Sequence, residues 1–541
     1  MAKILIPKES IESLIKLDEK GLDKLALFGT PVENITNSEV ELEISANRPD
    51  LLSTQGLIRS LSLYLGKNIK KYSIKKSATS RIIVDKSVKS SRPYTRCAII
   101  KDLKLNDTLM KQIVLLQEKL HNSIGKNRKQ LAIGIYPLEK IKFPITYTAK
   151  APKEISFQPL GSNKQMNALQ IIEKHPSGKE YGHLLSKESK YPIFIDANKS
   201  ILSMPPIINS EQTGRVTTST KELFVECSGN NPYLLEKTIN IIVTALADMG
   251  GTIHETIIED EKKESSPKLE WEKMKFDPDY LEKITGINLK ESEIQKCLEK
   301  MGHIYKNKSV LVAPWRTDIL HQIDIVEDIM IAHGYDKIIP ILPKISTIAQ
   351  EDELEKFKET LIELLIGQSA SQIMTPHLIT AEEAKKMKVS HTISVESSKS
   401  EFTILRPNLL IPMLRTLAHN TDTEYPQKIF ELGKVFTRDD SEECGIREDE
   451  FLCFALTPGN VTEAKQLAEY TIRMLNLQSS LKERKEEGFI DGRTATLLVN
   501  EQEIGHIGEM HPNTLNDWRL KMPLSIVTIN INSLFNLIYP K

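Results

Sequence analysis

The stretch from Ala313 to Pro340 constrains the fold of this chain most, because it combines a helical pattern with clear stop signals. It reads APWRTDILHQIDIVEDIMIAHGYDKIIP. At about 100° per residue, Asp324, Glu327 and Asp328 fall at positions i, i+3 and i+4 and share one face of a helix. The opposite face is apolar and consists of Ile325, Val326, Ile329, Met330 and Ala332. The pattern therefore predicts an amphipathic helix with an acidic side.

The ends and the charge of this helix leave two interpretations open. Thr317 or Asp318 can act as the N-cap, and Gly334 stands where a left-handed C-terminal residue is favoured. Like charges on one helical face repel by about 0.2–0.5 kcal/mol per pair unless a cation compensates. Asp318 could fold back at the helix start and complete an all-oxygen set suited to Mg²⁺. The alternative is a solvated acidic face beside Arg316.

Size and composition limit the class of protein. The chain has 541 residues, enough for about three or four domains of roughly 150 residues each. Its formal net charge is -1, so no overall positive field attracts nucleic acid, and any RNA contact must be local. No stretch approaches the roughly 20 apolar residues that cross a membrane. We expect a soluble multidomain protein with no membrane role.

The N-terminal sequence and the cysteines indicate a compartment. The start, MAKILIPKESIESL, predicts a short strand, a proline break and a helix, without the apolar region of a signal peptide. The cysteines are odd in number and widely separated: Cys97, Cys227, Cys297, Cys444 and Cys453. This pattern is typical of reduced, isolated thiols rather than of disulfides or a zinc site. We therefore expect a cytoplasmic protein.

Polar and charged runs divide the chain into four predicted domains of an α+β multidomain protein. The lysine-rich run KNIKKYSIKKSATS at 67–80 and the charged run DEKKESSPK at 260–268 are typical of linkers. The predicted domains are a mixed N-terminal domain at 1–75, an α/β domain at 76–265, a module at 266–340 and a last domain at 341–541.

Hydrophobic patterns indicate the structure of individual domains. Val40, Leu42 and Ile44 alternate with glutamates, which predicts a strand in the first domain. In the third domain, the pattern predicts two helices, a strand and then the acidic helix, an arrangement resembling a winged helix; the first three lie at 278–285, 291–301 and 309–313. The last domain has strands joined by hairpin-length turns, which predicts an antiparallel sheet flanked by helices.

Two predicted strands of the second domain end in small polar residues. One ends at Asn209-Ser210-Glu211 and the other at Glu226-Cys227-Ser228-Gly229. Hydroxyl and carboxyl groups at neighbouring strand ends could line a pocket, but the same residue types also stabilise turns. The residues alone leave both interpretations open.

Several stretches, in a fixed order and at consistent spacing, carry a resemblance to a known family. They are SANRPDLLSTQGLIRSL, LHNSIGKNRKQLAIGI, SMPPIINSEQTG, PWRTDILHQIDIVEDIMIAHGY, LRPNLLIPMLRTLAHN, YPQKIFELGKVF and IGHIGEMHP. Together they resemble the phenylalanyl-tRNA synthetase beta subunits of the shorter, archaeal and eukaryotic form, nearly from end to end.

The resemblance implies a ligase with two kinds of subunit, two alpha and two beta chains. A separate alpha subunit is expected to bind ATP and phenylalanine and to charge tRNA(Phe). The resemblance assigns a Mg²⁺ site in the winged-helix-like domain to Asp318, Asp324, Glu327 and Asp328. It makes the last domain a class II synthetase-like core without catalytic motifs. The sequence agrees, because it contains no glycine-rich GxGxGxxR-type run to bind ATP.

The resemblance also implies that residues 76–265 form an editing domain that hydrolyses tRNA(Phe) mischarged with tyrosine. A second site is needed because an apolar pocket rejects an analogue with one added hydroxyl only about 10²-fold. Carried over by motif, the editing pocket comprises Ser210, Glu211, Glu226 and Ser228.

The chain departs from the family at two places in this domain. Tyr136-Pro137 follows AIGI where many relatives have His-Asp, and Glu226-Cys227-Ser228 stands where Asp-Val-Thr is usual. Glutamate in place of aspartate moves the carboxylate by one methylene, and a displacement of about 1 Å can cost around 10²-fold in rate. Editing is therefore an open prediction.

Two other interpretations use different residues. A winged-helix-like module could make the chain a nucleic-acid-binding scaffold protein, although the near-neutral charge predicts only weak, sequence-independent DNA binding. A class I synthetase is suggested by His506-Ile507-Gly508-Glu509 and Lys386-Met387-Lys388-Val389-Ser390, but their order is reversed relative to that class. We therefore favour the ligase subunit.

Overall fold

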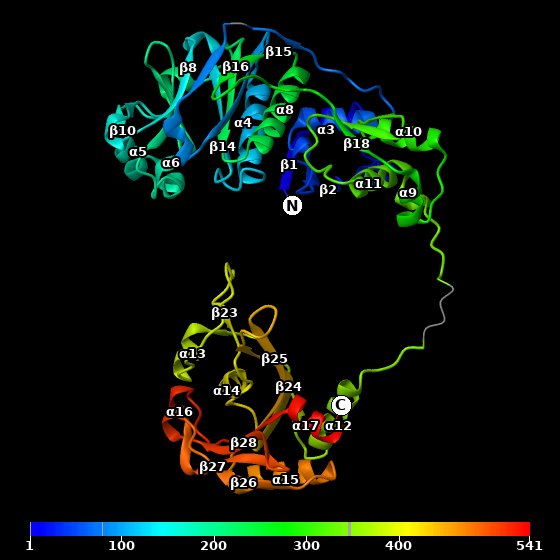
Figure 1. Ribbon diagram of the computed structural model, residues 1–541, viewed down its shortest axis with the longest axis vertical. Helices are drawn as coiled ribbons and strands as arrows, with labels where there is room; N and C mark the ends of the chain where they lie inside the picture. Colours follow the sequence, from blue (N-terminus) through cyan, green and yellow to red (C-terminus); the bar gives the residue numbers. More distant parts are fainter. Residues whose placement is uncertain (1, 78, 344–347, 541) are drawn as a thin grey trace. The chain divides into compact units, whose positions relative to one another are not determined.

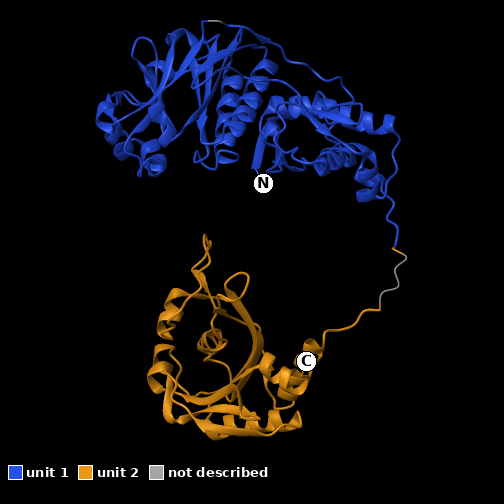
Figure 2. Ribbon diagram, in the orientation of Figure 1, with its two compact units in different colours: residues 1–342 blue, residues 343–541 orange. Residues whose placement is uncertain are grey.

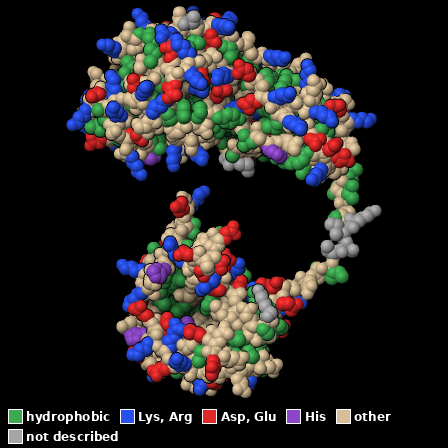
Figure 3. Space-filling view, in the orientation of Figure 1, with side chains coloured by type: hydrophobic (Ala, Val, Ile, Leu, Met, Phe, Trp, Pro, Cys, Tyr) green, Lys and Arg blue, Asp and Glu red, His purple; other side chains and the backbone are tan. Residues whose placement is uncertain are grey.

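The computed structural model describes residues 2–77, 79–343 and 348–540. The chain forms two compact units, residues 1–342 and 343–541, shown in Figure 1 and Figure 2. Both units mix helices and strands, so the multidomain class predicted from the sequence is confirmed. Acidic and basic side chains are interspersed over the visible face of each unit (Figure 3), in agreement with the net charge of -1. Within the described ranges, no helix has the length and apolar character needed to cross a membrane.

The first unit begins with a small antiparallel sheet and the helices that cover it. Its strands pair in the order β1 (Ala2–Pro7), β3 (Glu39–Ile44) and β2 (Val32–Ile35). Val40, Leu42 and Ile44 are fully buried while the glutamates between them are partly or fully exposed, which confirms the predicted strand. The helices are α1 (Lys8–Glu12), α2 (Glu19–Leu27), the 3-10 helix η1 (Pro49–Leu51) and α3 (Thr54–Tyr64).

Two sheets and a layer of helices form the middle of this unit (Figure 1). The first sheet has the order β4 (Ile74–Lys75), β15 (Thr252–His254), β6 (Tyr94–Lys101), β14 (Leu223–Gly229) and β7 (Leu131–Pro137). One face packs against α4 (Asp107–Asn122) and α8 (Pro232–Asp248). The other face packs against the second sheet through residues such as Cys97, Phe224 and Tyr136.

The second sheet has seven strands. Their order is β13 (Ile208–Asn209), β12 (Ile201–Met204), β11 (Tyr191–Ile195), β8 (Ile145–Lys150), β5 (Arg81–Val84), β16 (Thr256–Glu259) and β17 (Lys263–Ser266). Smaller elements surround it: η2 (Lys86–Ser90), η3 (Leu138–Lys140), η4 (Pro152–Glu154), η5 (Gly182–Leu184), β9 (Ser156–Phe157), β10 (Met166–Asn167), α5 (Ala168–Lys174), α6 (Pro176–Tyr181) and α7 (Glu211–Gly214).

The last part of the first unit contains the acidic helix. Its strands have the order β18 (Glu272–Lys275), β20 (Ser309–Val312) and β19 (Ile304–Lys306), and its helices are α9 (Pro278–Thr285), α10 (Glu291–Lys300), α11 (Gln322–His333) and η6 (Tyr335–Lys337). Both predicted helices and the predicted strand are present. The N-cap of α11 is His321 rather than Thr317 or Asp318. Gly334 ends the helix as predicted and has a positive φ of 104°, but its ψ of 116° lies outside the left-handed helical conformation that was predicted.

Both predicted linkers contribute ordered structure, so the linker prediction is wrong for parts of each. In 67–80, Lys70 Nζ and Tyr72 Oη each donate a hydrogen bond to Asp248 Oδ1 at 2.8 Å. In 260–268, β17 pairs with β16, and its charged side chains are exposed at the sheet edge. Charged residues are typical of edge strands as well as of linkers, and a partner as distant as Asp248 leaves no trace in the local pattern.

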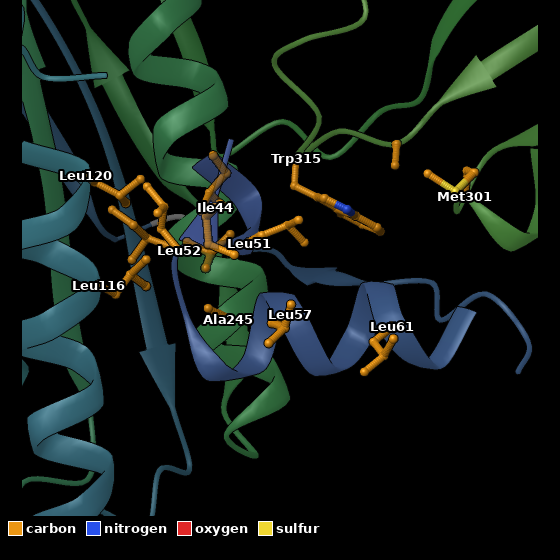
Figure 4. Close-up of a cluster of buried hydrophobic side chains, with 14 of the residues drawn as sticks. Ile44, Leu51, Leu52, Leu57, Leu61, Leu116, Leu120, Ala245, Met301 and Trp315 are labelled. Carbon is orange, nitrogen blue, oxygen red and sulfur yellow. The ribbon is translucent and has the colours of Figure 1, made fainter. Parts of the chain in front are cut away.

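One hydrophobic core runs through the first unit and includes residues from all three segments predicted as domains within 1–340. Figure 4 shows part of it, where side chains from the N-terminal part, from α4 and α8 and from the last part meet. The labelled residues are Ile44, Leu51, Leu52, Leu57, Leu61, Leu116, Leu120, Ala245, Met301 and Trp315. Because burial of apolar surface drives folding, these segments stabilise one another.

A buried arginine joins the acidic helix to the segment before it. Arg316 is 2% exposed. Its Nε and Nη2 donate to the two carboxylate oxygens of Asp318 at 2.8 and 2.7 Å, and Nη2 also donates to Asp328 Oδ1 at 3.0 Å. His303 Nε2 lies 2.7 Å from Asp328 Oδ2. Burial alone would raise the pKa of Asp328, but Arg316 and His303 outweigh it and hold this pKa well below its ordinary value.

The second unit is built on a seven-stranded sheet that is antiparallel except where β21 pairs with β24. Its order is β21 (Ser371–Gln372), β24 (Gln427–Arg438), β25 (Ile446–Thr457), β29 (Ser525–Asn530), β28 (Gln502–Met510), β27 (Phe489–Val499) and β26 (Ser479–Glu483). The remaining elements are α12 (Glu353–Ile366), β22 (Leu378–Thr380), α13 (Ala381–Lys386), β23 (Phe402–Leu405), α14 (Leu410–His419), α15 (Val461–Met474), α16 (Pro512–Asp517) and α17 (Ile531–Ile538). Hydrophobic clusters pack helices against the sheet, in agreement with the sequence prediction.

Replacing Arg316 with methionine should lower the free energy of unfolding of the first unit by about 3–5 kcal/mol, because two carboxylates lose their buried cation. Arg81→Met is the matched control. Arg81 pairs with Glu259 at 2.6 Å but its side chain is 49% exposed, so solvent screens this pair and we expect a much smaller loss than for Arg316. Urea denaturation followed by circular dichroism measures both variants, and equal losses would contradict the structural role of Arg316.

Candidate functional site

A cavity of about 720 Å³ lies at the edge of the five-stranded sheet, where β7 meets α4 and the segment 203–218. Much of its wall is apolar and includes Ile113, Ile133, Ile135, Pro205 and Ile207. The ionisable side chains that line it include Glu118, His121, Arg128 and Glu226. Apolar walls with a few placed polar groups are typical of sites that bind small molecules or parts of larger ones.

Glu226 lines this cavity from the middle of β14. It is 1% exposed and is paired with Cys97 on β6 and Gly134 on β7. Its Oε1 accepts a hydrogen bond from Tyr136 Oη at 3.2 Å, while Oε2 has no hydrogen-bond partner in the part of the chain that the structure describes. Burial raises the pKa of Glu226 to about 8, against the opposing effects of Tyr136 and Arg92. At neutral pH its carboxyl group is mostly protonated and can donate a hydrogen bond.

The Glu226 side chain has room because residue 134 is glycine. A Cβ atom at position 134 would overlap Tyr136 Oη and would lie 2.5 Å from Glu226 Oε1. Any other residue here would therefore displace the carboxyl group or the phenol ring. The hydroxyl of the fully buried Tyr136 also lies 3.4 Å from Asn209 Oδ1. Its single hydrogen can therefore be donated either to Glu226 or to Asn209. Tyr136 thus places a phenol directly on Glu226.

Two of the other predicted pocket residues support the wall of the cavity rather than line it. Ser210 is buried and precedes α7 as its N-cap residue. Glu211 accepts a hydrogen bond from the Gly161 N–H at 2.9 Å and forms an ion pair with Arg215. The hydrogen bond from Gly161 lowers the pKa of Glu211. Gly161 and Arg215 themselves line the cavity, so Glu211 ties two parts of the wall together.

The fourth predicted residue, Ser228, is fully buried at the end of β14 and also lies outside the cavity lining. Its carbonyl oxygen accepts a hydrogen bond from Arg92 Nη2 at 2.9 Å, and Arg92 Nη1 donates to the carbonyl of Arg128 at 3.3 Å. Burial lowers the pKa of Arg92. Ser228 is therefore connected, through Arg92, to the turn that carries Arg128.

Arg128 enters the cavity from a turn with an unusual backbone. Lys126, Asn127 and Arg128 have φ values of 47°, 53° and 65°, all in the left-handed region. Such residues cost roughly 1 kcal/mol or more each, so tertiary contacts must hold the turn. Arg128 Nη1 donates to the Ile207 carbonyl at 3.0 Å, and its guanidinium lies 4.2 Å from the centroid of the Tyr181 ring.

Glu118 and His121 complete this side of the cavity. His121 is buried, and its Nε2 accepts a hydrogen bond from the Ile133 N–H at 2.8 Å, so the ring proton lies on Nδ1. Burial lowers the pKa of His121, which keeps the ring neutral. Glu118 Oε1 accepts from Arg128 Nη2 at 3.2 Å. The i, i+3 spacing of Glu118 and His121 could have indicated a pair on one helical face, but nothing in the sequence shows which basic residue of the turn points inward.

The carboxylates predicted to bind Mg²⁺ do not form a four-ligand set in this chain. Asp318 and Asp328 are bound to Arg316, and Asp324 Oδ2 accepts hydrogen bonds from the N–H groups of residues 320 and 321, both at 2.8 Å. Glu327 is exposed while its neighbour Asp328 is buried. No group of three or more His, Cys, Asp or Glu residues is placed to hold a metal ion among the described residues. Arg316 and backbone N–H groups thus provide the compensation for the clustered carboxylates that was expected from a cation.

Comparisons with known proteins agree with this architecture. The family model of the "tRNA synthetase B5 domain" matches residues 274–335, and that of the "Phenylalanyl tRNA synthetase beta chain CLM domain" matches 338–531. An N-terminal fragment of the phenylalanyl-tRNA synthetase beta subunit from Pyrococcus horikoshii is similar in structure, with a TM-score of 0.58 and 36% identity, over 62% of this chain and 100% of the fragment.

Full-length relatives match in the same way. The phenylalanine-tRNA ligase beta subunit of Pyrococcus horikoshii is 37% identical over 505 residues, covering 90% of each chain. That of Methanococcus aeolicus is 35% identical over 552 residues, covering 97% of this chain and 99% of the relative. Because the similarity extends through both compact units, this chain belongs to the phenylalanine-tRNA ligase beta subunit family.

Proposed function

We propose that this chain acts as the beta subunit of a phenylalanine-tRNA ligase, in which a separate alpha subunit uses ATP to charge tRNA(Phe) with phenylalanine. One observation carries the proposal: relatives named as this subunit match over nine-tenths or more of both chains. Two alpha and two beta chains, and action in the cytoplasm, are part of the same proposal.

The second unit supports a role without ATP binding of its own. Arg406 lies within LRPNLLIPMLRTLAHN and is almost fully buried. Its Nη1 donates to Glu431 Oε1 at 2.7 Å and to Thr375 Oγ1 at 2.8 Å, and its Nε donates to the Lys434 carbonyl at 2.8 Å. Two guanidinium nitrogens of Arg406 are thus bound within the unit, and the chain has no glycine-rich GxGxGxxR-type run to bind ATP. We therefore assign ATP and phenylalanine to the alpha subunit.

The alternative of a nucleic-acid-binding scaffold is not favoured. It rests on the helical module alone, whereas the relatives match through both units. The net charge of -1 also gives no general attraction to DNA.

Magnesium at Asp318, Asp324, Glu327 and Asp328 stays a prediction. Within this chain, two of these carboxylates are paired with Arg316 and one caps its own helix, which leaves Glu327 as the exposed member of the set. We propose no step of the reaction that depends on this ion.

We further propose that the cavity at Glu226 hydrolyses tRNA(Phe) mischarged with tyrosine. Tyrosine differs from phenylalanine by one hydroxyl, and Glu226 offers an unpaired carboxyl oxygen inside an otherwise largely apolar wall. A phenol bound there would satisfy that buried oxygen, whereas a phenylalanine ring would leave it unpaired. Sites built to hydrogen-bond a substrate hydroxyl reject the analogue that lacks it by about 10⁴–10⁵-fold. Glu226 is thus assigned to selecting tyrosine rather than to activating water.

Co-expression with the matching alpha subunit tests the ligase proposal. We expect the two chains to purify together, with a mass that corresponds to two copies of each, and to charge tRNA(Phe) with phenylalanine. The alpha subunit purified alone is the control and should be inactive, because the complementary subunit is missing. Failure of the two chains to associate, or equal activity without this chain, would contradict the proposal.

Variants of Glu226 test the selection of tyrosine. Glu226→Leu in the complex should lower the ratio of tyrosine release to phenylalanine release from charged tRNA(Phe) by about 10²-fold or more. Glu226→Gln should keep most of the preference, because an amide also hydrogen-bonds the phenol. Glu222→Leu, outside the cavity lining, is the matched control. An unchanged ratio in Glu226→Leu would remove this residue from the site.

Glu226 should also make the stability of the first unit depend on pH. Its folded-state pKa of about 8 lies above the ordinary 4.5, so the folded protein keeps the proton between these values and the unfolded chain does not. The stabilisation is complete below pH 4.5 and decreases by roughly 1.4 kcal/mol per pH unit until about pH 8. The Tm of the wild type relative to Glu226→Gln, measured from pH 5 to 8, should fall as the pH rises. A constant difference would contradict the raised pKa.

A further inference from the structure

A second cavity, of about 460 Å³, lies apart from the Glu226 site, between α1, α3 and the end of α8. Figure 1 shows α3 and α8 side by side. The residues that line it include several with hydroxyl or amide side chains, namely Ser10, Thr54, Gln55, Ser62 and Asn68. This volume lies in the range of pockets that bind small molecules, about 300–1,000 Å³.

The charged residues of this cavity are unbalanced. Arg59, Lys67 and Lys70 are cations, and Asp248 is the one carboxylate in the lining. Asp248 is already engaged: it accepts hydrogen bonds from Arg59 Nη1 at 2.7 Å, Lys70 Nζ at 2.8 Å and Tyr72 Oη at 2.8 Å. One carboxylate shared in this way neutralises one cation, so the cavity keeps an excess of positive charge.

Arg59 is buried with part of its guanidinium unused. Its side chain is 6% exposed, and among the described residues its Nε and Nη2 have no hydrogen-bond partner. Thr54 Oγ1 and Gln55 Oε1, which line the same cavity, are also buried without a partner there. Burying a charged donor without a partner is costly. The Arg59 guanidinium is held in place by Asp248 on one side and by the Trp315 ring, 4.6 Å away, on another.

Other carboxylates near Arg59 do not supply the missing anion. Asp50 interacts electrostatically with Arg59, but its two carboxylate oxygens accept hydrogen bonds from Arg48 Nε and Nη2, each at 2.9 Å. The unused donors of Arg59 therefore have no acceptor among the described residues. Because a guanidinium presents a planar pair of N–H donors, it suits the oxygens of a phosphate group.

We propose that this cavity binds a small phosphorylated molecule, whose phosphate accepts hydrogen bonds from Arg59 and Thr54. Lys67 lies at the exposed rim and adds charge, while the surrounding hydroxyl and amide groups suit a polar body such as a sugar. The proposal concerns a site distinct from the Glu226 cavity and does not depend on the ligase function.

Calorimetric titration of the full-length chain with inorganic phosphate and with adenosine monophosphate tests the proposal. We expect saturable binding at one site. Lys67→Gln should weaken it by about tenfold, and Thr54→Val should weaken it by a similar factor, because each removes one donor or charge. Lys67 is exposed, so its replacement should leave the fold intact, which circular dichroism checks. Arg59→Gln should abolish binding. If that variant unfolds, Lys67→Gln and Thr54→Val still test the site.

A matched control distinguishes binding at this site from a general electrostatic attraction of anions to the lysine-rich segment. Lys71→Gln removes a charge from the same segment but from outside the cavity lining, and it should leave binding unchanged. Equal weakening by Lys71→Gln and Lys67→Gln would overturn the proposal, as would the absence of saturable phosphate binding at millimolar concentration. Binding of single-stranded RNA that lacks terminal phosphates, without binding of the two small phosphates, would also overturn it.

Discussion

The buried guanidinium of Arg316 is the interaction on which the first unit most depends. It forms hydrogen-bonded ion pairs with both Asp318 and Asp328, and its charge also acts on Asp50 from the N-terminal part. Its neighbour Trp315 lies in the hydrophobic core and packs against Tyr72 at 5.5 Å between ring centroids. Two successive residues thus connect α11 to the N-terminal segment by charge and by apolar contact. The unit tolerates buried carboxylates at this point because their cation is buried with them.

The pKa of the buried Glu226 in its cavity shifts in the opposite direction. Among the described residues no cation is hydrogen-bonded to Glu226, so burial raises its pKa to about 8, whereas Arg316 keeps the pKa of the equally buried Asp328 low. A carboxyl group that stays protonated and keeps one oxygen unpaired is available to a ligand. A carboxylate locked in an ion pair is not. This contrast explains why we assign selection of a substrate to Glu226 and a structural role to Asp328.

Local patterns in the sequence were sufficient for much of the fold. The helices at Pro278–Thr285 and Gln322–His333 and the strand at Glu39–Ile44 follow from the spacing of apolar residues, since each element buries one face. Glu226 was predicted by motif and does line a cavity. Arg128 was missed because three successive left-handed residues direct it inward, and such a turn is held by distant partners such as Ile207 rather than by its own sequence.

The sequence by itself therefore determined the elements, the family and the residue types at the site. Tertiary structure alone decided which carboxylates are free. Indexing on a helix placed Asp328 with Asp324 and Glu327 on one acidic face, yet Asp328 is buried against Arg316 and His303 while Glu327 is exposed. Likewise, Asp248 is satisfied by Arg59, Lys70 and Tyr72, which are at least 176 positions away along the chain. The physical reason is that helical periodicity fixes a direction around an axis, whereas the charge state of a carboxylate depends on which side chains the rest of the fold brings against it.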